Sequence, residues 1–324
     1  MQASVLMSIY NESEKQIREA IISILNQTFA DFELIIIGDN PNRCDLKSII
    51  DNFDDKRIRL YINENNIGLA MCMNKAASLA KSNYYFRMDA DDVALPNRFE
   101  KEIDILLSGK YDFCYSSYNT INSRSEIIKE AIPESDVMDS DFLHKQIQYG
   151  PNIIHHPTVA FTKNIFEKTN GYRNFPCSQD SDLWLRMAEV GCRFYQIGTP
   201  LLNYRINENS ITNKRWYQQQ ITCHYIFELS LQRIIKGKDN FSTDNYEKYL
   251  RRWKIGKQEE EKKLRTAMNL LQKAESFPIF KKLFFRTYVF VISPVQRRHF
   301  IALIIKKILL LLFKSSSIQT IPNQ

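Results

Sequence analysis

The sequence predicts an α/β protein whose mostly parallel sheet is flanked by helices, and three patterns support this fold class. Apolar runs of about four to seven residues recur through the first two thirds of the chain and end in Gly, Asn or Asp. Several of these runs precede stretches with helical periodicity. The run from Leu34 to Ile37 is apolar at every position, which is typical of a strand covered on both faces.

The strands expected from these runs are residues 5–10, 34–37, 58–62, 84–88 and 113–118. Between the first two strands, Ser13 and Gln16 have the spacing of a capping box. The apolar stripe after them predicts a crossover helix and consists of Ile17, Ile21, Ile24 and Leu25. Similar stripes predict helices at about 69–80 and 98–107. From about 215 to 275 we expect two helices around a break near 237–242.

Composition excludes a disordered chain, because 44% of the 324 residues are hydrophobic. No uninterrupted apolar run, Ile308 to Phe313 included, approaches the roughly 20 residues that cross a bilayer.

No basic leader precedes the first apolar run, so we expect no secretory signal and place the chain in the cytoplasm. The six cysteines are scattered without a CxxC pair, which predicts free thiols and neither a disulfide nor a zinc site.

Charge is divided unequally along the chain. Residues 1–213 carry 22 basic and 29 acidic side chains, a net charge of −7, whereas residues 214–324 carry 22 and 8, a net charge of +14. The segment 277–314 has eight basic residues and no acidic one among many apolar residues, which favours attachment to an anionic membrane surface. The alternative is a solvated basic face that packs on the main domain. Nucleic acid is a weaker interpretation, because the recognisable site lies in the acidic part.

Acidic residues follow two of the expected strands. Asp39 follows the second strand, and Asp89, Asp91 and Asp92 follow the fourth. In an extended turn the side chains of Asp89 and Asp91 point the same way, so they can converge on Mg²⁺ or Mn²⁺ and leave positions open for a diphosphate. The alternative is a helix-capping role, which is all that Asp92 need have.

A second acidic pair, Asp180 and Asp182, precedes a stretch with helical spacing. We expect Asp182 or Ser178 to cap that helix, which leaves Asp180 free to act. A carboxylate near the metal site could take a proton from an attacking hydroxyl. Partial burial beside other acids would raise its pKa and make it a stronger base.

Taken together, these motifs resemble those of family 2 glycosyltransferases, which have the Rossmann-like GT-A fold. The resemblance covers about residues 3–213, and the ordered set of motifs is more specific than any one of them. The matching segments are 4–12, 24–36, 63–70, Asn74 and Lys75, 87–98, 156–158, Gly171 and Tyr172, and 179–186.

The resemblance implies a nucleotide-diphosphate sugar donor and inversion at the anomeric carbon by direct displacement. It implies that Asp39 contacts the nucleotide base, that Asp89 and Asp91 form the DXD motif for a Mn²⁺ or Mg²⁺ ion and the diphosphate, and that Asp180 is the catalytic base. The other donor-binding residues that it implies are Tyr10, Glu12, Asn66, Gly68, Asn74, Lys75, Arg87 and Ala90. For Arg87 and Arg98 we expect ion pairing with the aspartates.

Four residues are candidates for contact with the acceptor or the diphosphate: His156, Gln179, Trp184 and Asn207. For His156, a structural role in orienting the loop before Pro157 is an equal alternative. Gln179 stands where the family usually has Glu, Gly38 where another Asp is frequent, and Met73 where some relatives have Arg. Asn207 stands where His is common, and its neutral amide is a poorer metal ligand.

The expected organisation is a GT-A catalytic domain at 1–213, a helical extension at 214–276 and a basic amphipathic tail at 277–324. We expect transfer of one sugar from a UDP-hexose or UDP-N-acetylhexosamine to a polyprenyl-diphosphate-linked saccharide, in O-antigen (lipopolysaccharide) or capsule synthesis. The enzyme would be peripheral on the inner face of the bacterial inner membrane. The alternatives are a nucleotidyltransferase that forms nucleotide sugars, disfavoured because no Gly-rich phosphate loop is present, and a non-catalytic membrane-attached module.

Overall fold

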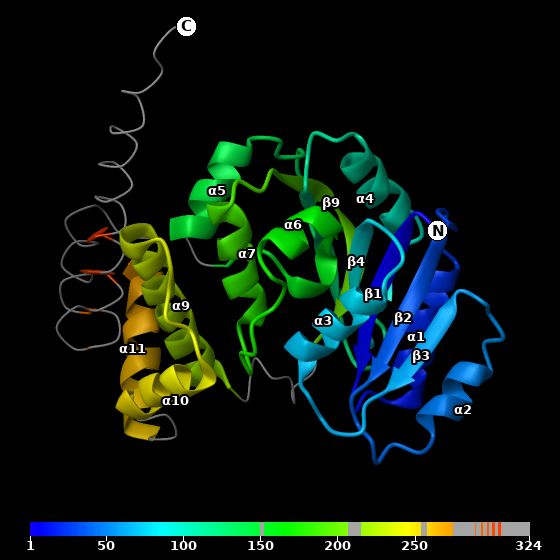
Figure 1. The fold of residues 1–324 in the computed structure, drawn as a ribbon, viewed down its shortest axis with the longest axis horizontal. Coiled ribbons are helices and arrows are strands. Elements are labelled where there is room, and N and C mark those ends of the chain that lie inside the picture. The colour runs from blue at the N-terminus through cyan, green and yellow to red at the C-terminus, as the bar shows by residue number, and fades with distance from the viewer. Residues whose placement is uncertain are drawn as a thin grey trace, which may run out of the picture. The chain divides into compact units, whose positions relative to one another are not determined.

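The computed structural model describes residues 1–149, 152–206, 215–253 and 258–274, together with positions 289, 293, 297, 300, 301, 304 and 305. The chain divides into two compact units, residues 1–210 and 211–324 (Figure 1). Asn207 and most of the segment 277–324 lie outside the described residues.

The first unit is built on one nine-stranded sheet in the order β3-β2-β1-β4-β8-β6-β9-β5, with β7 paired to β6. The strands are β1 (Ala3–Ile9), β2 (Phe32–Gly38), β3 (Ile58–Ile62), β4 (Tyr84–Asp89), β5 (Val93–Ala94), β6 (Phe113–Ile121), β7 (Ile127–Lys129), β8 (Val159–Thr162) and β9 (Phe194–Arg205). The first four strands in this order are parallel, whereas β8 runs antiparallel to both β4 and β6. The parallel strands lie side by side in Figure 1.

Helices cover both faces of this sheet. They are α1 (Glu14–Leu25), α2 (Leu46–Asp51), α3 (Leu69–Leu79), α4 (Arg98–Leu107), α5 (Ser140–Tyr149), α6 (Lys163–Lys168) and α7 (Gln179–Glu189), with the short helix η1 (His156–Thr158) before β8. Apolar residues of α1, α2 and α4 share one core cluster, and those of α3, α5, α6 and α7 share the other. Leu34 and Ile36 belong to the first cluster and Ile35 and Ile37 to the second, so β2 is buried on both faces as its sequence predicts.

The local signals account for the helix positions. Ser13 and Gln16 form the expected capping box at the start of α1, with the Gln16 amide donating to Ser13 Oγ at 3.3 Å. Ile17, Ile21 and Ile24 are buried, and Leu25 is partly buried against the same core. The stripe therefore turns α1 toward the sheet and directs the chain from β1 into β2.

The second unit contains α9 (Trp216–Lys236), α10 (Thr243–Arg252) and α11 (Gln258–Ala274). The expected break near 237–242 is present, and Gly237 ends α9 with φ +70°. The expectation of only two helices is wrong, because α10 and α11 are separate elements.

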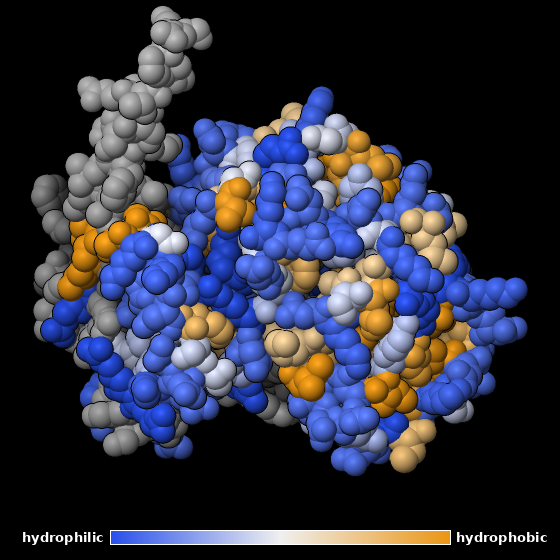
Figure 2. Space-filling model, viewed as in Figure 1, coloured by the Kyte–Doolittle hydropathy of each residue, from blue (hydrophilic) through white to orange (hydrophobic). Residues whose placement is uncertain are grey.

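All six cysteines lie within the described residues and are free thiols. Among those residues we find no helix that combines the length and the apolar character needed to span a membrane. Figure 2 shows a face on which hydrophilic residues predominate and hydrophobic ones are scattered in small groups.

Candidate active site

The carboxyl ends of the parallel strands carry a compact acidic cluster. Carboxylate oxygens of Asp89, Asp91 and Asp92 all lie within 4.8 Å of one another. Asp89 is the last residue of β4, and the turn after it carries the other two. The cluster therefore contains the expected DXD pair and a third carboxylate, that of Asp92.

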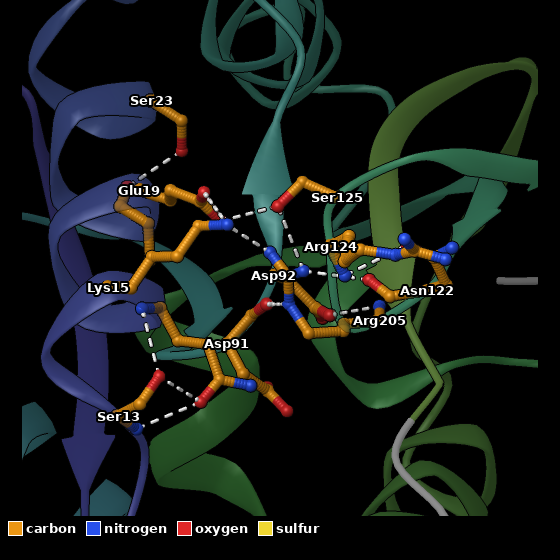
Figure 3. A network of polar contacts seen from close by, with 12 residues as sticks. Ser13, Lys15, Glu19, Ser23, Asp91, Asp92, Asn122, Arg124, Ser125 and Arg205 are labelled. Carbon is orange, nitrogen blue, oxygen red and sulfur yellow. Dashed lines mark hydrogen bonds and ion pairs between the residues drawn. The ribbon is translucent and has the colours of Figure 1, made fainter.

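Asp92 does not cap a helix, which corrects the capping alternative. Asn97 occupies the N-cap position of α4, while Asp92 is fully buried and accepts the main-chain N–H of Arg205 through Oδ1 at 2.8 Å. The Arg205 guanidinium donates to the carbonyl of Asp91 at 2.6 Å and to Glu19 Oε2 of α1 at 2.7 Å. It also donates to the turn after β6, at the Asn122 carbonyl and Ser125 Oγ. Figure 3 shows this network, which fixes the acid-bearing turn against three other elements.

The electrostatics of the cluster fit a divalent cation with oxygen ligands. Burial, together with the negative charges of Asp89 and Glu12, raises the pKa of Asp91 to about 7. Burial and the same kind of repulsion raise the pKa of Asp92 well above its ordinary value. Asp92 Oδ2 is buried and has no hydrogen-bond partner in the described part of the chain. Close carboxylates that repel one another, with one oxygen unpartnered, are a suitable ligand set for Mg²⁺ or Mn²⁺.

Arg87 is the buried cation of the site. Its side chain forms an ion pair with Asp89, as expected, and is almost fully buried. Its Nε and Nη1 atoms have no hydrogen-bond partner among the described residues. The same expectation is wrong for Arg98, which pairs with Glu102 at 2.9 Å and donates to the carbonyl of Arg87 at 2.8 Å. Arg98 thus supports the backbone of β4 instead of the aspartates.

Asp39 shapes the loop that leads into α3. Its Oδ1 accepts from Asn63 Nδ2 at 2.8 Å and from the Ile67 amide at 2.9 Å, and its Oδ2 accepts from the Gly68 amide at 2.9 Å. Lys75 Nζ donates to Asn63 Oδ1 at 2.6 Å. Beside this loop is a pocket of about 350 Å³ whose lining includes Asn63, Ile67 and Lys75. The structure therefore joins Asp39 and Lys75 through Asn63, and Asn63 and Lys75 line this pocket.

The remaining donor-binding candidates of the first strands lie near this edge of the sheet. Tyr10 is exposed at the end of β1, and its amide donates to Glu12 Oε2 at 2.7 Å. Burial raises the pKa of Glu12, and the charge of Asp89 adds to this shift. Asn66 is exposed, and Gly68 has φ +80°, a conformation that glycine adopts without strain. Ala90 is buried between the two DXD aspartates.

Asn74, expected at the donor site, makes two contacts within the fold. Its side-chain amide donates to the carbonyl of Tyr172 and accepts from the amide of Tyr172, both at 2.8 Å. Both polar atoms are engaged, so Asn74 joins α3 to the loop before α7. That approach requires glycine at position 171, where φ is +65° and a Cβ would lie 2.6 Å from Asn74 Oδ1.

Asp180 lies in the first turn of α7 and is partly exposed. Asn152 Nδ2 donates to Asp180 Oδ2 at 3.1 Å. Burial raises the pKa of Asp180, while Arg87 is among the groups that oppose the shift. The expected rise of the Asp180 pKa and its expected cause, burial, are both confirmed, but the neighbouring charge is that of Arg87, which opposes the rise.

The expectation that Asp182 caps α7 is wrong. Asp182 is fully buried and accepts from Arg186 Nε at 2.8 Å. Ser178 occupies the N-cap position in the left-handed region, with φ +57°, but its side chain makes no cap hydrogen bond. Arg186 also donates to the carbonyl of Gly171 at 2.9 Å, so the Asp182–Arg186 pair holds the loop before α7.

The four candidates for acceptor or diphosphate contact have different outcomes. His156 is buried and its Nε2 lies 2.7 Å from the hydroxyl of Tyr172, which favours the structural alternative. Burial lowers the pKa of His156 well below its usual range. Trp184 is corrected, because it is 1% exposed and packs on Phe113, with ring centroids 4.7 Å apart. Gln179 is partly exposed at the start of α7, and Asn207 lies outside the described residues.

Residues 4–169 match the family model described as glycosyl transferase family 2, which covers about half of the chain. The chain belongs to glycosyltransferase family 2. The O-antigen biosynthesis glycosyltransferase WbnJ of Escherichia coli is 34% identical over 240 residues, which cover 72% of this chain and 89% of WbnJ. A second E. coli relative, UDP-Glc:alpha-D-GlcNAc-diphosphoundecaprenol beta-1,3-glucosyltransferase WfgD, is 32% identical over 66% of this chain and 80% of its own length. This glycosyltransferase is thus related to bacterial surface-polysaccharide sugar transferases.

A solved structure agrees in fold. The structure of Staphylococcus aureus TarS 1-349 in complex with UDP-GlcNAc has a TM-score of 0.59 to this glycosyltransferase at 15% identity. The match covers 91% of this chain and 82% of that one. At this identity the likeness supports the GT-A fold, in agreement with the sheet and helices described above.

Sequence reasoning missed two residues of this family 2 site. Arg205 holds the acid-bearing turn, and Asn152 contacts Asp180. A buried arginine at the end of a strand was the available signal for Arg205, since Arg is almost never buried without partners. Asn152 gave no local signal, because its partner is distant in sequence. Tyr172 belongs to a matching motif, but its contacts with Asn74 and His156 emerged only in the structure.

Proposed function

We propose that this chain is an inverting glycosyltransferase that moves one hexose or N-acetylhexosamine from a UDP-sugar to a polyprenyl-diphosphate-linked saccharide, in O-antigen or capsule synthesis. The activity for which WfgD is named, a β-1,3 transfer from UDP-Glc to a diphosphoundecaprenol-linked sugar, supports this choice. A second E. coli relative, 29% identical, is named for the same β-1,3 transfer from UDP-Gal.

One observation carries the mechanism: Asp180 and the acid cluster act on the same buried groups. The charges of Asp180 and Asp89 both raise the pKa of the Tyr172 hydroxyl, to which burial contributes most. Arg87, which pairs with Asp89, is also among the groups that lower the pKa of Asp180. These shared charge effects support Asp180 as the base of one in-line displacement at the acid cluster.

In this proposal Asp180 accepts the proton of an acceptor hydroxyl while that oxygen forms a bond to the anomeric carbon. The bond from the anomeric carbon to the diphosphate oxygen breaks, and its electron pair leaves with the nucleoside diphosphate. Attack from the opposite side inverts the configuration, so an α-linked donor yields a β-glycoside. The raised pKa of Asp180 favours proton transfer.

Asp89 and Asp91 would hold the divalent ion, and Asp92 is a third candidate ligand. The bound ion would supply charge stabilisation for the leaving diphosphate. Arg87 neutralises Asp89, and Arg205 keeps the turn that bears Asp91 and Asp92 in place. Lys75 lines the pocket that we assign to the nucleoside, and Asp39 binds two of its other lining residues, Asn63 and Ile67.

The test is incubation of the full chain with Mn²⁺, a set of nucleotide sugars and a synthetic α-GlcNAc diphosphate carrying an undecyl chain. We expect UDP release together with a β-linked product detected by mass. Release of inorganic diphosphate from a sugar phosphate and UTP would instead indicate a nucleotidyltransferase. Donor binding without release of any product would indicate a non-catalytic module.

We also propose that the tail, residues 277–324, attaches the protein to the inner face of the membrane. Its eight basic residues up to position 314, without an acidic one, match an anionic surface. Deletion of 277–324 should move the protein out of the membrane fraction, and its full retention there would contradict the proposal.

A further inference from the structure

Three ring side chains gather beside the acid cluster, and we call them the aromatic triad: Tyr118 of β6, His155, and Tyr204 of β9. The ring of Tyr118 lies 4.2 Å from that of His155 and 5.5 Å from that of Tyr204, and the rings of His155 and Tyr204 are also 5.5 Å apart. The Tyr118 hydroxyl lies 2.6 Å from His155 Nε2. His155 is exposed and the two tyrosines are partly exposed, so the triad presents ring surface to solvent.

One side of the triad adjoins the acid cluster. Tyr204 precedes Arg205, whose main-chain N–H is bound by Asp92 Oδ1. Successive residues of a strand point to opposite faces, so Arg205 reaches α1 while Tyr204 faces the other way, toward His155. The charges of Asp89, Asp92 and Asp91 add to the effect of burial in raising the pKa of Tyr204.

The other side of the triad is linked to Asp180 through the segment that carries Asn152. His155 lies three residues after Asn152 on a short segment, and Asn152 Nδ2 donates to Asp180 Oδ2 at 3.1 Å. The next residue, His156, contacts the Tyr172 hydroxyl, which feels the charges of both Asp180 and Asp89. The triad therefore lies next to the turn that carries the acids and is linked to Asp180 through the segment that carries Asn152.

We propose that the aromatic triad is a binding subsite for the pyranose ring of the acceptor saccharide. This inference rests on the proposed function and adds the acceptor side of the same site. A pyranose is uncharged and has a face of C–H groups that packs on aromatic rings, so it can lie next to the carboxylates where a further anion would be repelled.

The triad suits the acceptor better than the donor sugar because of where its residues come from. The donor candidates Asp39, Gly68 and Lys75 lie at β2 and α3, in the parallel part of the sheet. The triad comes from β6, β9 and the segment before η1, at the other end of the strand order. A ring held there presents a hydroxyl to Asp180 while the donor occupies the opposite side.

The test uses the full chain and two variants at one position. Tyr204→Leu removes the ring and keeps apolar bulk against the core, whereas Tyr204→Phe keeps the ring. The probe is the α-GlcNAc diphosphate with an undecyl chain. We expect Tyr204→Leu to raise the KM for this acceptor about tenfold, which corresponds to about 1.4 kcal/mol. Tyr204→Phe should keep the acceptor KM of the wild type, and neither variant should change the KM for UDP-sugar.

Tyr195→Leu is the matched control, because Tyr195 lies on the same strand but pairs with Cys114 at the far end of β6. Its acceptor KM should equal that of the wild type. An unchanged acceptor KM in Tyr204→Leu, or an equal rise in the donor KM, would overturn the inference even if transfer itself is confirmed.

A direct binding measurement separates this inference from the proposed function. Saturation-transfer NMR with the same probe should show contact to the saccharide protons in the wild type and a clear loss in Tyr204→Leu. Binding that depends on Tyr204 without transfer would support the subsite and count against the proposed function. Absence of both binding and transfer in the wild type would overturn the subsite.

Discussion

Asp92 Oδ1 accepts the main-chain N–H of Arg205 at 2.8 Å, across 113 residues of sequence. This hydrogen bond joins the end of β9 to the turn that carries the acid cluster. Because Asp92 is fully buried, the bond also fixes which of its oxygens can face a bound ion. The position of the cluster thus depends on a strand that is distant in sequence.

We expect Arg205→Lys to loosen the acid-bearing turn. Lysine keeps the charge but cannot reproduce the guanidinium contacts with Asp91, Asn122 and Glu19, so the free energy of unfolding should fall by about 3 kcal/mol. Mn²⁺ affinity should fall as well. Chemical denaturation and Mn²⁺ titration measure both quantities.

The control for Arg205→Lys is Arg193→Lys, which weakens an ion pair with Asp112 in which Arg193 is half exposed. That change should cost about 1 kcal/mol or less. Equal losses in the two variants would contradict the role of Arg205.

Asp180→Asn should abolish the proton acceptor and leave the donor site intact. We expect kcat for UDP release in the presence of acceptor to fall by about 10²- to 10⁴-fold, which is the usual contribution of a general base. Calorimetric titration with UDP and Mn²⁺ should give the wild-type affinity. Glu189→Gln, at the other end of α7, is the control, and unchanged turnover in Asp180→Asn would refute the assignment.

Asp89→Asn and Asp91→Asn should each weaken Mn²⁺ binding strongly, because each removes a charged oxygen ligand. Chelation should stop product release by the wild type, and added Mn²⁺ should restore it. Electron paramagnetic resonance of free Mn²⁺ measures binding independently of activity. Asp104→Asn on the exposed side of α4 serves as the control, and wild-type binding by both site variants would exclude this metal site.

Gly171→Ala should destabilise the protein more than Gly191→Ala does. Both glycines have positive φ, +65° and +82°, so both substitutions strain the backbone by about 1 kcal/mol. Only at Gly171 would the new Cβ also meet other atoms, with Asn74 Oδ1 at 2.6 Å. We expect a loss of about 3 kcal/mol there, and thermal or denaturant unfolding of the two variants would show whether the extra loss exists.

Without metal, the free energy of unfolding should decrease as pH rises from about 4 to 7. The pKa of Asp91 is raised from 3.8 to about 7 in the folded state, so between these values the folded protein binds more protons than the unfolded chain. Stability therefore falls as that extra proton is lost, with a limiting slope of about 1.4 kcal/mol per pH unit.

Asp91→Asn should reduce this slope, and Mn²⁺ should reduce it only when Asp91 is present. Glu102→Gln is the comparison, since burial raises the pKa of Glu102 to about 7 beside Arg98. The part of the pH slope that Glu102→Gln removes should be the same with and without Mn²⁺. Denaturation curves at several pH values, with chelator or Mn²⁺, measure these slopes. A free energy of unfolding that does not change with pH in the metal-free wild type would contradict the prediction.

The sequence by itself determined β1 to β4 and β6, the crossover helix after β1 and the place of the acid cluster, whereas β5, β7, β8 and β9 emerged only in the structure. Each of the predicted features follows from neighbours in the chain: apolar runs give strands, a 3.6-residue stripe gives α1, and acids after a buried run must lie at the strand end. The DXD pair could be named on this basis, and Asp180 was named from its place before a helix and from the family resemblance.

Tertiary structure alone decided the roles of Asn74, Trp184 and Arg205. Their partners are distant in the chain: Asn74 binds the main chain of Tyr172, Trp184 packs on Phe113, and Arg205 binds Asp92 and Glu19. An amide, an indole or a guanidinium can serve a ligand or the fold equally well. Which of the two it serves depends on the groups that long-range packing places beside it, and local sequence carries no record of those contacts.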